Sequence, residues 1–87
     1  MEINLRGKLA LVTGGGGQLG RVISRTLAAC GADVVINYNH SQPKAEAVLR
    51  EVLALGVRGM INQADVTDQT AILAMKSQIL AVMGKAP

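Results

Sequence analysis

The residues with the clearest chemical meaning form a glycine-rich run. Residues 13–20 read Thr-Gly-Gly-Gly-Gly-Gln-Leu-Gly, after an apolar segment at 9–12 and before an amphipathic stretch that begins near Arg21. A buried strand, a glycine turn and a helix in this order can hold a pyrophosphate. The unpaired N–H groups and positive dipole of the helix start point at the anion, and no side chain blocks its approach. The pattern therefore predicts a dinucleotide-binding unit.

Two glycine spacings fit this run. Gly15, Gly17 and Gly20 match G-x-G-x-x-G. The longer pattern T-G-x-x-G-x-x-G also fits, beginning at Thr13 and Gly14. In both patterns the early glycines allow a tight turn and a bare backbone, and the last lets the helix pack closely on the sheet. Consecutive glycines also suit a flexible loop without a ligand, but a second strand about twenty residues further on favours the nucleotide.

Alternating apolar and amphipathic segments predict the elements that would position this loop. We expect strands at 8–13, 33–38 and 58–64 and helices at 18–30, from about 42 to 55, and at 68–83. Short right-handed crossovers between them give an α/β fold, a partial Rossmann βαβαβα unit with three parallel strands ordered 3-2-1 and flanking helices. The expected inward face of the first helix is Leu19, Val22, Ile23, Thr26, Leu27 and Cys30, and that of the second is Ala45, Val48, Leu49, Val52 and Leu53.

The third helix is apolar on more than one side. One stripe comprises Ile72, Met75, Ile79 and Met83, and a second flank comprises Leu73, Leu80 and Val82. A helix of this kind needs partners on two sides, so we expect self-association or a complementing chain.

Composition narrows the class of protein. The 87 residues are 49% hydrophobic and 17% charged with one aromatic residue, which suits an aliphatic parallel sheet buried on both faces. The net charge of +3 is spread without a basic run, so we expect no nucleic-acid partner. One cysteine and one histidine offer neither a disulfide nor a metal site. With no signal-like start and no membrane-length apolar run, we expect a cytoplasmic protein.

Several segments resemble the short-chain dehydrogenase/reductase family. They are residues 5–14 (Leu-Arg-Gly-Lys-Leu-Ala-Leu-Val-Thr-Gly), residues 31–35 (Gly-Ala-Asp-Val-Val) and residues 65–68 (Asp-Val-Thr-Asp). The greatest resemblance is to β-ketoacyl-(acyl-carrier-protein) reductases and related NADPH-dependent members. It implies that residues 1–87 are the N-terminal, adenosine-binding part of a Rossmann domain, with the catalytic and nicotinamide-binding part absent. The short members of the family carry glycine where this chain has Gln18, followed here by Leu19.

The end of the second strand bears on the choice of cofactor. NAD-binding folds place a carboxylate there for the ribose 2′-hydroxyl, whereas residues 37–39 read Asn-Tyr-Asn, so NADP(H) is favoured over NAD(H). The family resemblance assigns cofactor contacts to Tyr38, Asn39, His40, Ser41, Asp65 and Val66. Arg21 and Lys44 could add charge for a 2′-phosphate. Plainer alternatives are a helix cap for Ser41 and for Asp65, a solvated turn for His40 and a surface position for Arg21.

The resemblance also implies chemistry that these residues do not carry. The family reduces ketones with a serine and a Tyr-x-x-x-Lys pair, but Tyr38, the only tyrosine, is followed four residues later by Gln42. We therefore predict no catalytic residue and no reductase activity for this chain alone. The expected function is the cofactor-binding segment of an NADP(H)-dependent oxidoreductase that transfers hydride between NADPH and a ketone or 3-oxoacyl group. A non-catalytic nucleotide-binding module and an assembly fragment stay open.

Overall fold

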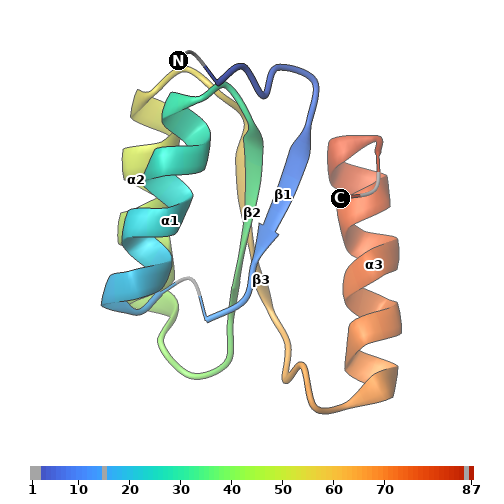
Figure 1. The fold of residues 1–87 in the computed structure, drawn as a ribbon. Helices are drawn as coiled ribbons and strands as arrows, with labels where there is room; N and C mark the ends of the chain where they lie inside the picture. The colour runs from blue at the N-terminus through green and yellow to red at the C-terminus, as the bar shows by residue number, and fades with distance from the viewer. Residues whose placement is uncertain (1–2, 15, 86) are drawn as a thin grey trace.

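The computed structural model describes residues 3–14, 16–85 and 87, and it contains the six elements in the predicted order (Figure 1). They are β1 (Leu9–Val12), α1 (Gln18–Ala29), β2 (Asp33–Tyr38), α2 (Gln42–Ala54), β3 (Gly59–Gln63) and α3 (Gln69–Met83). The strands at both ends of the sheet are shorter than expected, because pairing stops where the chain turns into the loops.

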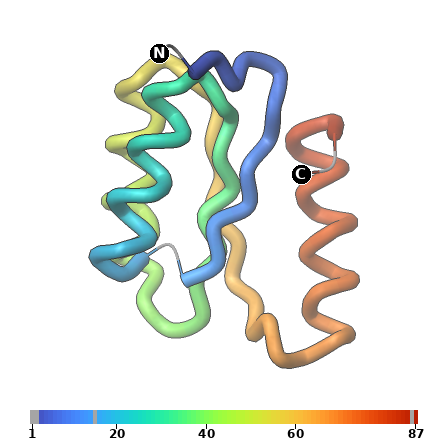
Figure 2. Tube along the Cα trace, viewed as in Figure 1, coloured from blue at the N-terminus to red at the C-terminus, as the bar shows by residue number. Residues whose placement is uncertain are grey.

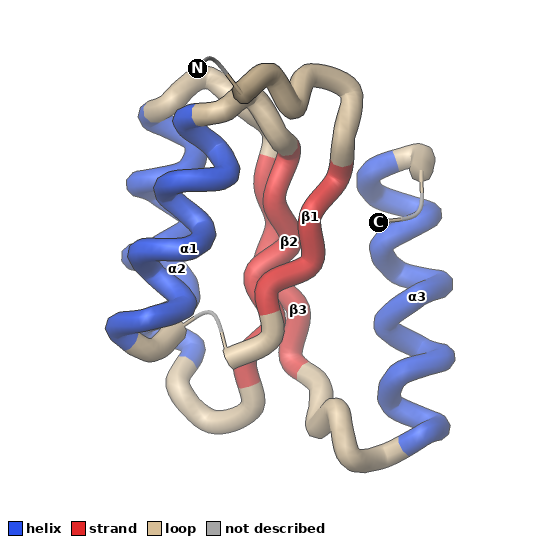
Figure 3. The backbone as a smooth tube through the Cα atoms, viewed as in Figure 1, coloured by secondary structure: helices blue, strands red, loops and turns tan. Residues whose placement is uncertain are grey.

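The three strands form one parallel sheet in the order β1-β2-β3, which confirms the predicted 3-2-1 arrangement. Leu11 lies beside Val35, and Val35 lies beside Met60. Helices α1 and α2 cover one face of the sheet and α3 covers the other, as the traces in Figures 2 and 3 show. Within the described residues, no helix is long and apolar enough to cross a membrane.

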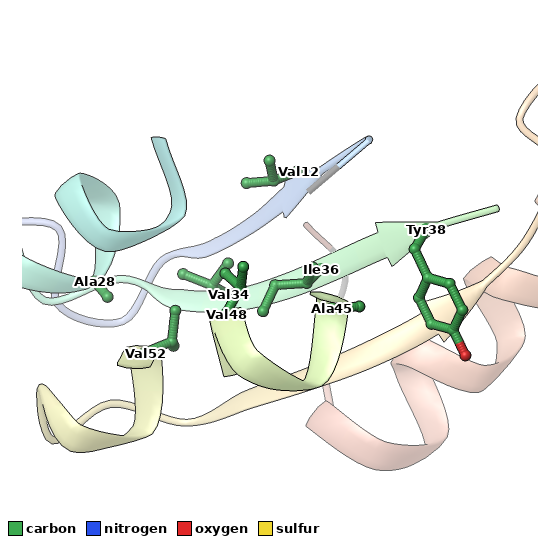
Figure 4. Packing of buried hydrophobic residues seen from close by; sticks show 8 residues of the cluster. All are labelled: Val12, Ala28, Val34, Ile36, Tyr38, Ala45, Val48 and Val52. Atoms are coloured by element: carbon green, nitrogen blue, oxygen red, sulfur yellow. The ribbon is translucent and has the colours of Figure 1, made fainter. Parts of the chain in front are cut away.

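Two separate cores lie on the two faces of the sheet, because successive residues of β2 point to opposite sides. Val34, Ile36 and Tyr38 face α1 and α2, and Figure 4 shows Tyr38 at the carboxyl end of this row of side chains. Val35 instead joins the core beneath α3, which also contains Met60, Met75, Ile79 and Met83. Burial on both faces explains why the sequence of β2 is continuously apolar over residues 34–36.

The predicted inward face of α1 is wrong except at Leu27, which packs against the core. Leu19, Val22 and Ile23 are 73%, 51% and 41% exposed, Thr26 is exposed, and Leu27 and Cys30 are only partly buried. The buried residues of α1 are instead Gly20, Ser24 and Ala28. Three small residues on one face let the helix backbone approach the sheet closely, and this approach turns the larger apolar side chains outward.

The predicted faces of the other helices need smaller corrections. Ala45, Val48 and Val52 are buried on α2 and Leu49 packs against the same core, but Leu53 is 47% exposed. On α3 the stripe contains Met75, Ile79 and Met83, while Ile72 is 38% exposed. The second flank of α3 is exposed as the pattern predicts.

Polar contacts fix both ends of α3. The Asp68 carboxylate caps its start by accepting from the N–H groups of Thr70 at 2.9 Å and Ala71 at 3.4 Å. At the other end, the Arg58 guanidinium donates to the carbonyls of Val82 at 3.3 Å and Met83 at 3.0 Å. No N–H group inside the helix donates to these carbonyls. Arg58 supplies the missing donor and complements the negative end of the helix dipole.

The Asp33 carboxylate organises the same end of the sheet. It accepts a hydrogen bond from the Arg58 backbone N–H at 2.9 Å and pairs with the Lys85 ammonium at 3.2 Å. Burial disfavours the carboxylate, but the Arg58 N–H and Lys85 outweigh this, so the pKa of Asp33 lies below its ordinary value.

Replacing Asp33 by Asn tests this network. Because the pKa of Asp33 is lower in the folded chain, its stabilisation is present above about pH 4, the ordinary Asp pKa, and is lost as acid protonates the folded carboxylate. We expect Asp33→Asn to cost about 0.5–1 kcal/mol at pH 7 and nothing at strongly acid pH, measured by urea denaturation. Lys85→Met should show the same pH dependence. An equal cost at all pH values would contradict the assignment.

Candidate nucleotide-binding site

The three loops that follow β1, β2 and β3 leave the sheet at one edge, the lower edge in Figure 3. Parallel pairing brings the carboxyl ends of all three strands together there. These loops carry the predicted glycine run, residues 39–41 and residues 65–66. The fold therefore gathers the predicted cofactor residues at one edge, and Gly15 lies outside the described residues.

The glycine run makes a closed turn into α1. Gly14 has a φ of +65°, and its carbonyl accepts the N–H of Gly17 at 3.2 Å. Gly17 then caps α1 by accepting the N–H of Arg21 at 2.9 Å. The N–H groups of the first turn have no acceptor inside the helix, and this turn contains no acidic residue. They present the positive end of the helix dipole to an anion.

The remaining residues of the run frame this helix start. Thr13, Gln18 and Leu19 are exposed, whereas Gly20 is buried against the sheet. Gln18, which stands where short members of the family have glycine, is the first residue of α1. It therefore follows the turn that the hydrogen bond between Gly17 and Gly14 closes.

Gly16 brings the glycine turn against the first turn of α2. A Cβ atom at Gly16 would lie 3.4 Å from the Ala45 backbone nitrogen and 3.5 Å from the Lys44 Cβ. Beside this contact is an open pocket of about 330 Å³ lined by Gly16, Gly17, Arg21 and Lys44 among others. Two helix starts and two cations thus surround one hollow, which suits an anionic group.

Arg21 is held by an ion pair that the sequence does not predict. Its guanidinium donates from Nε to Glu51 Oε2 at 2.8 Å and from Nη2 to Oε1 at 2.6 Å, linking α1 to α2. These hydrogen bonds and the Arg21 charge lower the pKa of Glu51. Because Glu51 balances the charge of Arg21, Lys44 is the cation of the pocket with no ion-pair partner among the described residues.

The loop after β2 offers polar groups and no carboxylate. Tyr38 is buried, Asn39 and His40 are exposed, and Ser41 is half-buried. Ser41 stands at the N-cap of α2, but its side chain makes no capping hydrogen bond, so its hydroxyl is not committed to the helix. Residues 37–41 read Asn-Tyr-Asn-His-Ser, which leaves this strand end without the acid that binds a ribose 2′-hydroxyl.

Asp65 shapes the loop after β3. Its Oδ1 accepts the Thr67 hydroxyl at 2.6 Å and the Thr67 N–H at 2.9 Å, and α3 begins only at the cap Asp68. The alternative reading of Asp65 as the cap of the next helix is therefore wrong. The Thr67 hydrogen bonds lower the pKa of Asp65. Val66 is 41% exposed beside it.

Two residues that connect these loops were missed by sequence reasoning. Asn37 on β2 donates to the carbonyl of Ala64 at 3.2 Å, and Gln63 on β3 donates to the carbonyl of Asn39 at 3.2 Å. The available signal was a polar residue at each strand end, within segments that otherwise provide core residues. Sequence spacing alone does not show which carbonyl such an amide reaches.

Other potential sites are less well developed. Among residues 3–14, 16–85 and 87, no group of three or more His, Cys, Asp or Glu side chains is placed to hold a metal ion. A larger hollow of about 730 Å³ lies at the opposite edge of the sheet, where Asp33 and Arg58 line it. Those two groups already bond each other and the end of α3, so this hollow is the less suitable candidate.

The element order and the parallel sheet define a partial Rossmann-like α/β fold. A family model described as short chain dehydrogenase matches residues 8–86, and the chain belongs to that family. Over 77 residues it is 42% identical to the 3-oxoacyl-(acyl-carrier-protein) reductase FabG of Staphylococcus aureus, covering 88% of this chain and 31% of that protein. It is 40% identical over 81 residues to hydroxynaphthalene reductase arp2 of Aspergillus fumigatus, covering 93% of this chain and 30% of that protein.

Solved structures agree with the family assignment. A short chain dehydrogenase from Burkholderia cenocepacia, crystallised in complex with NADP, is 41% identical and superimposes with a TM-score of 0.88. The match covers 95% of this chain and 34% of that one. The chain thus spans about a third of the length of the relatives it matches.

Alanine substitutions in the glycine turn test its backbone geometry. At Gly14 the left-handed φ of +65° penalises any side chain, so we expect Gly14→Ala to lower the free energy of unfolding by about 1–2 kcal/mol. Gly17 has an extended backbone, with φ −81° and ψ 172°, and a Cβ there meets only the Gly14 carbonyl at 3.6 Å. Gly17→Ala should therefore leave the free energy of unfolding nearly unchanged. Thermal unfolding of both variants measures the difference. Equal losses would contradict the described turn.

Proposed function

We propose that this chain is the adenosine-binding part of an NADP(H)-dependent short-chain oxidoreductase, and that the pyrophosphate lies at the start of α1. The observation that carries the proposal is the bare first turn of α1 behind a glycine turn, with no acidic residue in it. Its free N–H groups match the acceptor oxygens of a pyrophosphate. The cofactor contacts are proposed to come from Thr13, Gly14, Gly15, Gly17, Gln18, Leu19 and Gly20, and from Tyr38, Asn39, His40, Ser41, Asp65 and Val66.

A preference for NADP(H) over NAD(H) follows from charge. The end of β2 offers hydroxyl, amide and imidazole groups without a carboxylate that would repel a 2′-phosphate. Lys44 lines the adjacent pocket without an ion-pair partner among the described residues. The Burkholderia cenocepacia relative, crystallised in complex with NADP, supports the same choice.

The reaction of the whole oxidoreductase is proposed to be hydride transfer between NADPH and a ketone or 3-oxoacyl group, since the matched curated relatives are named as reductases. None of the described residues is assigned a catalytic role. A nucleotide-binding module without chemistry of its own would use the same site. We propose a cytoplasmic location for the oxidoreductase and for such a module alike.

A fragment that works through association is the second candidate, favoured by exposed apolar surface. β1 stands at an edge of the sheet, and Leu19 and Val22 are exposed on α1. On α3, Leu73 and Leu80 are 60% and 54% exposed. Apolar side chains on both helix layers beside an open strand edge favour association with another copy or a complementing chain.

Nucleotide titrations of variants at Lys44 test the proposed site. We expect 2′,5′-ADP to bind more tightly than 5′-AMP, because Lys44 is proposed to contact the additional 2′-phosphate. In isothermal titration calorimetry, Lys44→Met should weaken the binding of 2′,5′-ADP about fivefold and leave that of 5′-AMP unchanged. Lys76→Met removes an exposed lysine from α3 on the other face of the sheet and is the matched control. Tight NADH binding without NADPH binding would refute the preference.

Charge substitutions on α3 test association. Leu73→Lys with Leu80→Lys places two charges on the exposed apolar flank and should shift sedimentation toward the monomer. Ala74→Lys with Ala81→Lys adds the same charges at the same spacing on exposed positions about 100° around the helix from the two leucines, and should leave association unchanged. A monomeric unaltered chain at all concentrations would refute the association proposal.

A further inference from the structure

The side chain of Asn37 is a buried amide among apolar residues. It is 2% exposed on the face of β2 that packs beneath α3, where its neighbour on the strand is Val35. Burying an amide in such a place is costly unless it is hydrogen-bonded. Its Nδ2 donates to the carbonyl of Ala64 at 3.2 Å and lies 3.5 Å from the carbonyl of Asn62.

The Ala64 carbonyl matters because it stands one residue before Asp65. The last backbone hydrogen bond between the two strands runs from the Ala64 N–H to the Tyr38 carbonyl at 3.0 Å. Beyond Tyr38 the chain leaves the sheet toward α2, and the Asn37 side chain takes over as partner for β3. The amide therefore extends the pairing of β3 to the residue from which the loop with Asp65 and Val66 departs.

A second amide connects the same two loops in the opposite direction. Gln63 on β3 donates to the carbonyl of Asn39, the first residue after β2. Within the next loop, Asp65 is bonded to Thr67 through both the backbone and the side chain of Thr67. The loops after β2 and β3 are thus joined and internally ordered by contacts within the protein.

We propose that Asn37 is a positioning residue for the adenosine part of the nucleotide: by clamping Ala64 it fixes the loop that carries Asp65 and Val66. The choice of ligand rests on the proposed function, whereas the clamp is a property of the chain itself. A loop already ordered before binding loses less conformational freedom when the ligand arrives, so the clamp raises affinity without touching the ligand.

Asn62 provides a matched control within the same sheet. It lies beside Asn37 in the strand register, it is 5% exposed, and it faces the same core. Its Nδ2 donates to the side chain of Gln78 on α3, not to the loop. Replacing either asparagine by leucine removes one buried amide of the same size. Only Asn37→Leu also releases the Ala64 carbonyl.

The experiment compares Asn37→Leu with Asn62→Leu. Calorimetric titration with 2′,5′-ADP should show about five- to tenfold weaker binding for Asn37→Leu and unchanged binding for Asn62→Leu. Pyrophosphate alone, which addresses the start of α1, should bind both variants as it binds the unaltered chain. Hydrogen exchange of the Thr67 and Asp68 amides, which bond to Asp65, should accelerate only in Asn37→Leu.

Each outcome decides the proposal. Equal weakening of 2′,5′-ADP in both variants would reduce Asn37 to a general structural role and overturn the positioning role. Unchanged amide exchange in Asn37→Leu would overturn the clamp, whatever the chain binds. Absence of 2′,5′-ADP binding to the unaltered chain would instead overturn the proposed function and the ligand assigned here, leaving the exchange result to judge the clamp. If Asn37→Leu does not fold, Asn37→Ser, whose hydroxyl is too short to reach Ala64, replaces it with the same expectations.

Discussion

Parallel pairing of the strands is the constraint on which the remaining features depend. A parallel connection must return the chain to the same end of the sheet, so each strand is followed by a loop and a helix that crosses back. All three loops therefore leave at one edge, and the helix that follows each loop starts there. The bare start of α1 and the polar residues after β2 and β3 become neighbours although they are up to about fifty residues apart in the chain.

Backbone groups at the two edges of the sheet therefore have different hydrogen-bond partners. At the amino edge, Arg58 satisfies the last carbonyls of α3, and Asp33 holds both the Arg58 N–H and Lys85. At the carboxyl edge, the first turn of α1 keeps its N–H groups without an acidic cap. Side chains there bond to neighbouring loop carbonyls instead, as Asn37 and Gln63 do. Polar side chains are thus bonded within the protein at both edges, and the N–H groups at the start of α1 have no acceptor inside the helix.

Much of this arrangement could be predicted because it depends on local pattern. The elements, their order and the parallel sheet follow from apolar runs, glycine stops and short connections. The face of α1 could not be predicted in this way, since Leu19, Val22 and Ile23 have the required spacing but Gly20, Ser24 and Ala28 allow the closer approach. Periodicity shows that a helix has an apolar side, and the packing distance decides which side faces the sheet. Partners distant in the chain, such as Arg21 and Glu51, leave no local signal.

The exposed apolar side chains of α1 and α3 can be related to the length of this chain within its family. In a chain that spans about a third of its relatives' length, the α1 and α3 surfaces beside β1 are where additional structure would remove apolar area from water. The start of α1 does not depend on that cover, because its turn is closed by Gly14 and Gly17 and its inner face is buried on the sheet. The loops after β2 and β3 are likewise joined by residues within the chain. The start of α1 and the two loops are thus held by contacts within the described residues, whereas the proposed association would cover the exposed apolar side chains of α1 and α3.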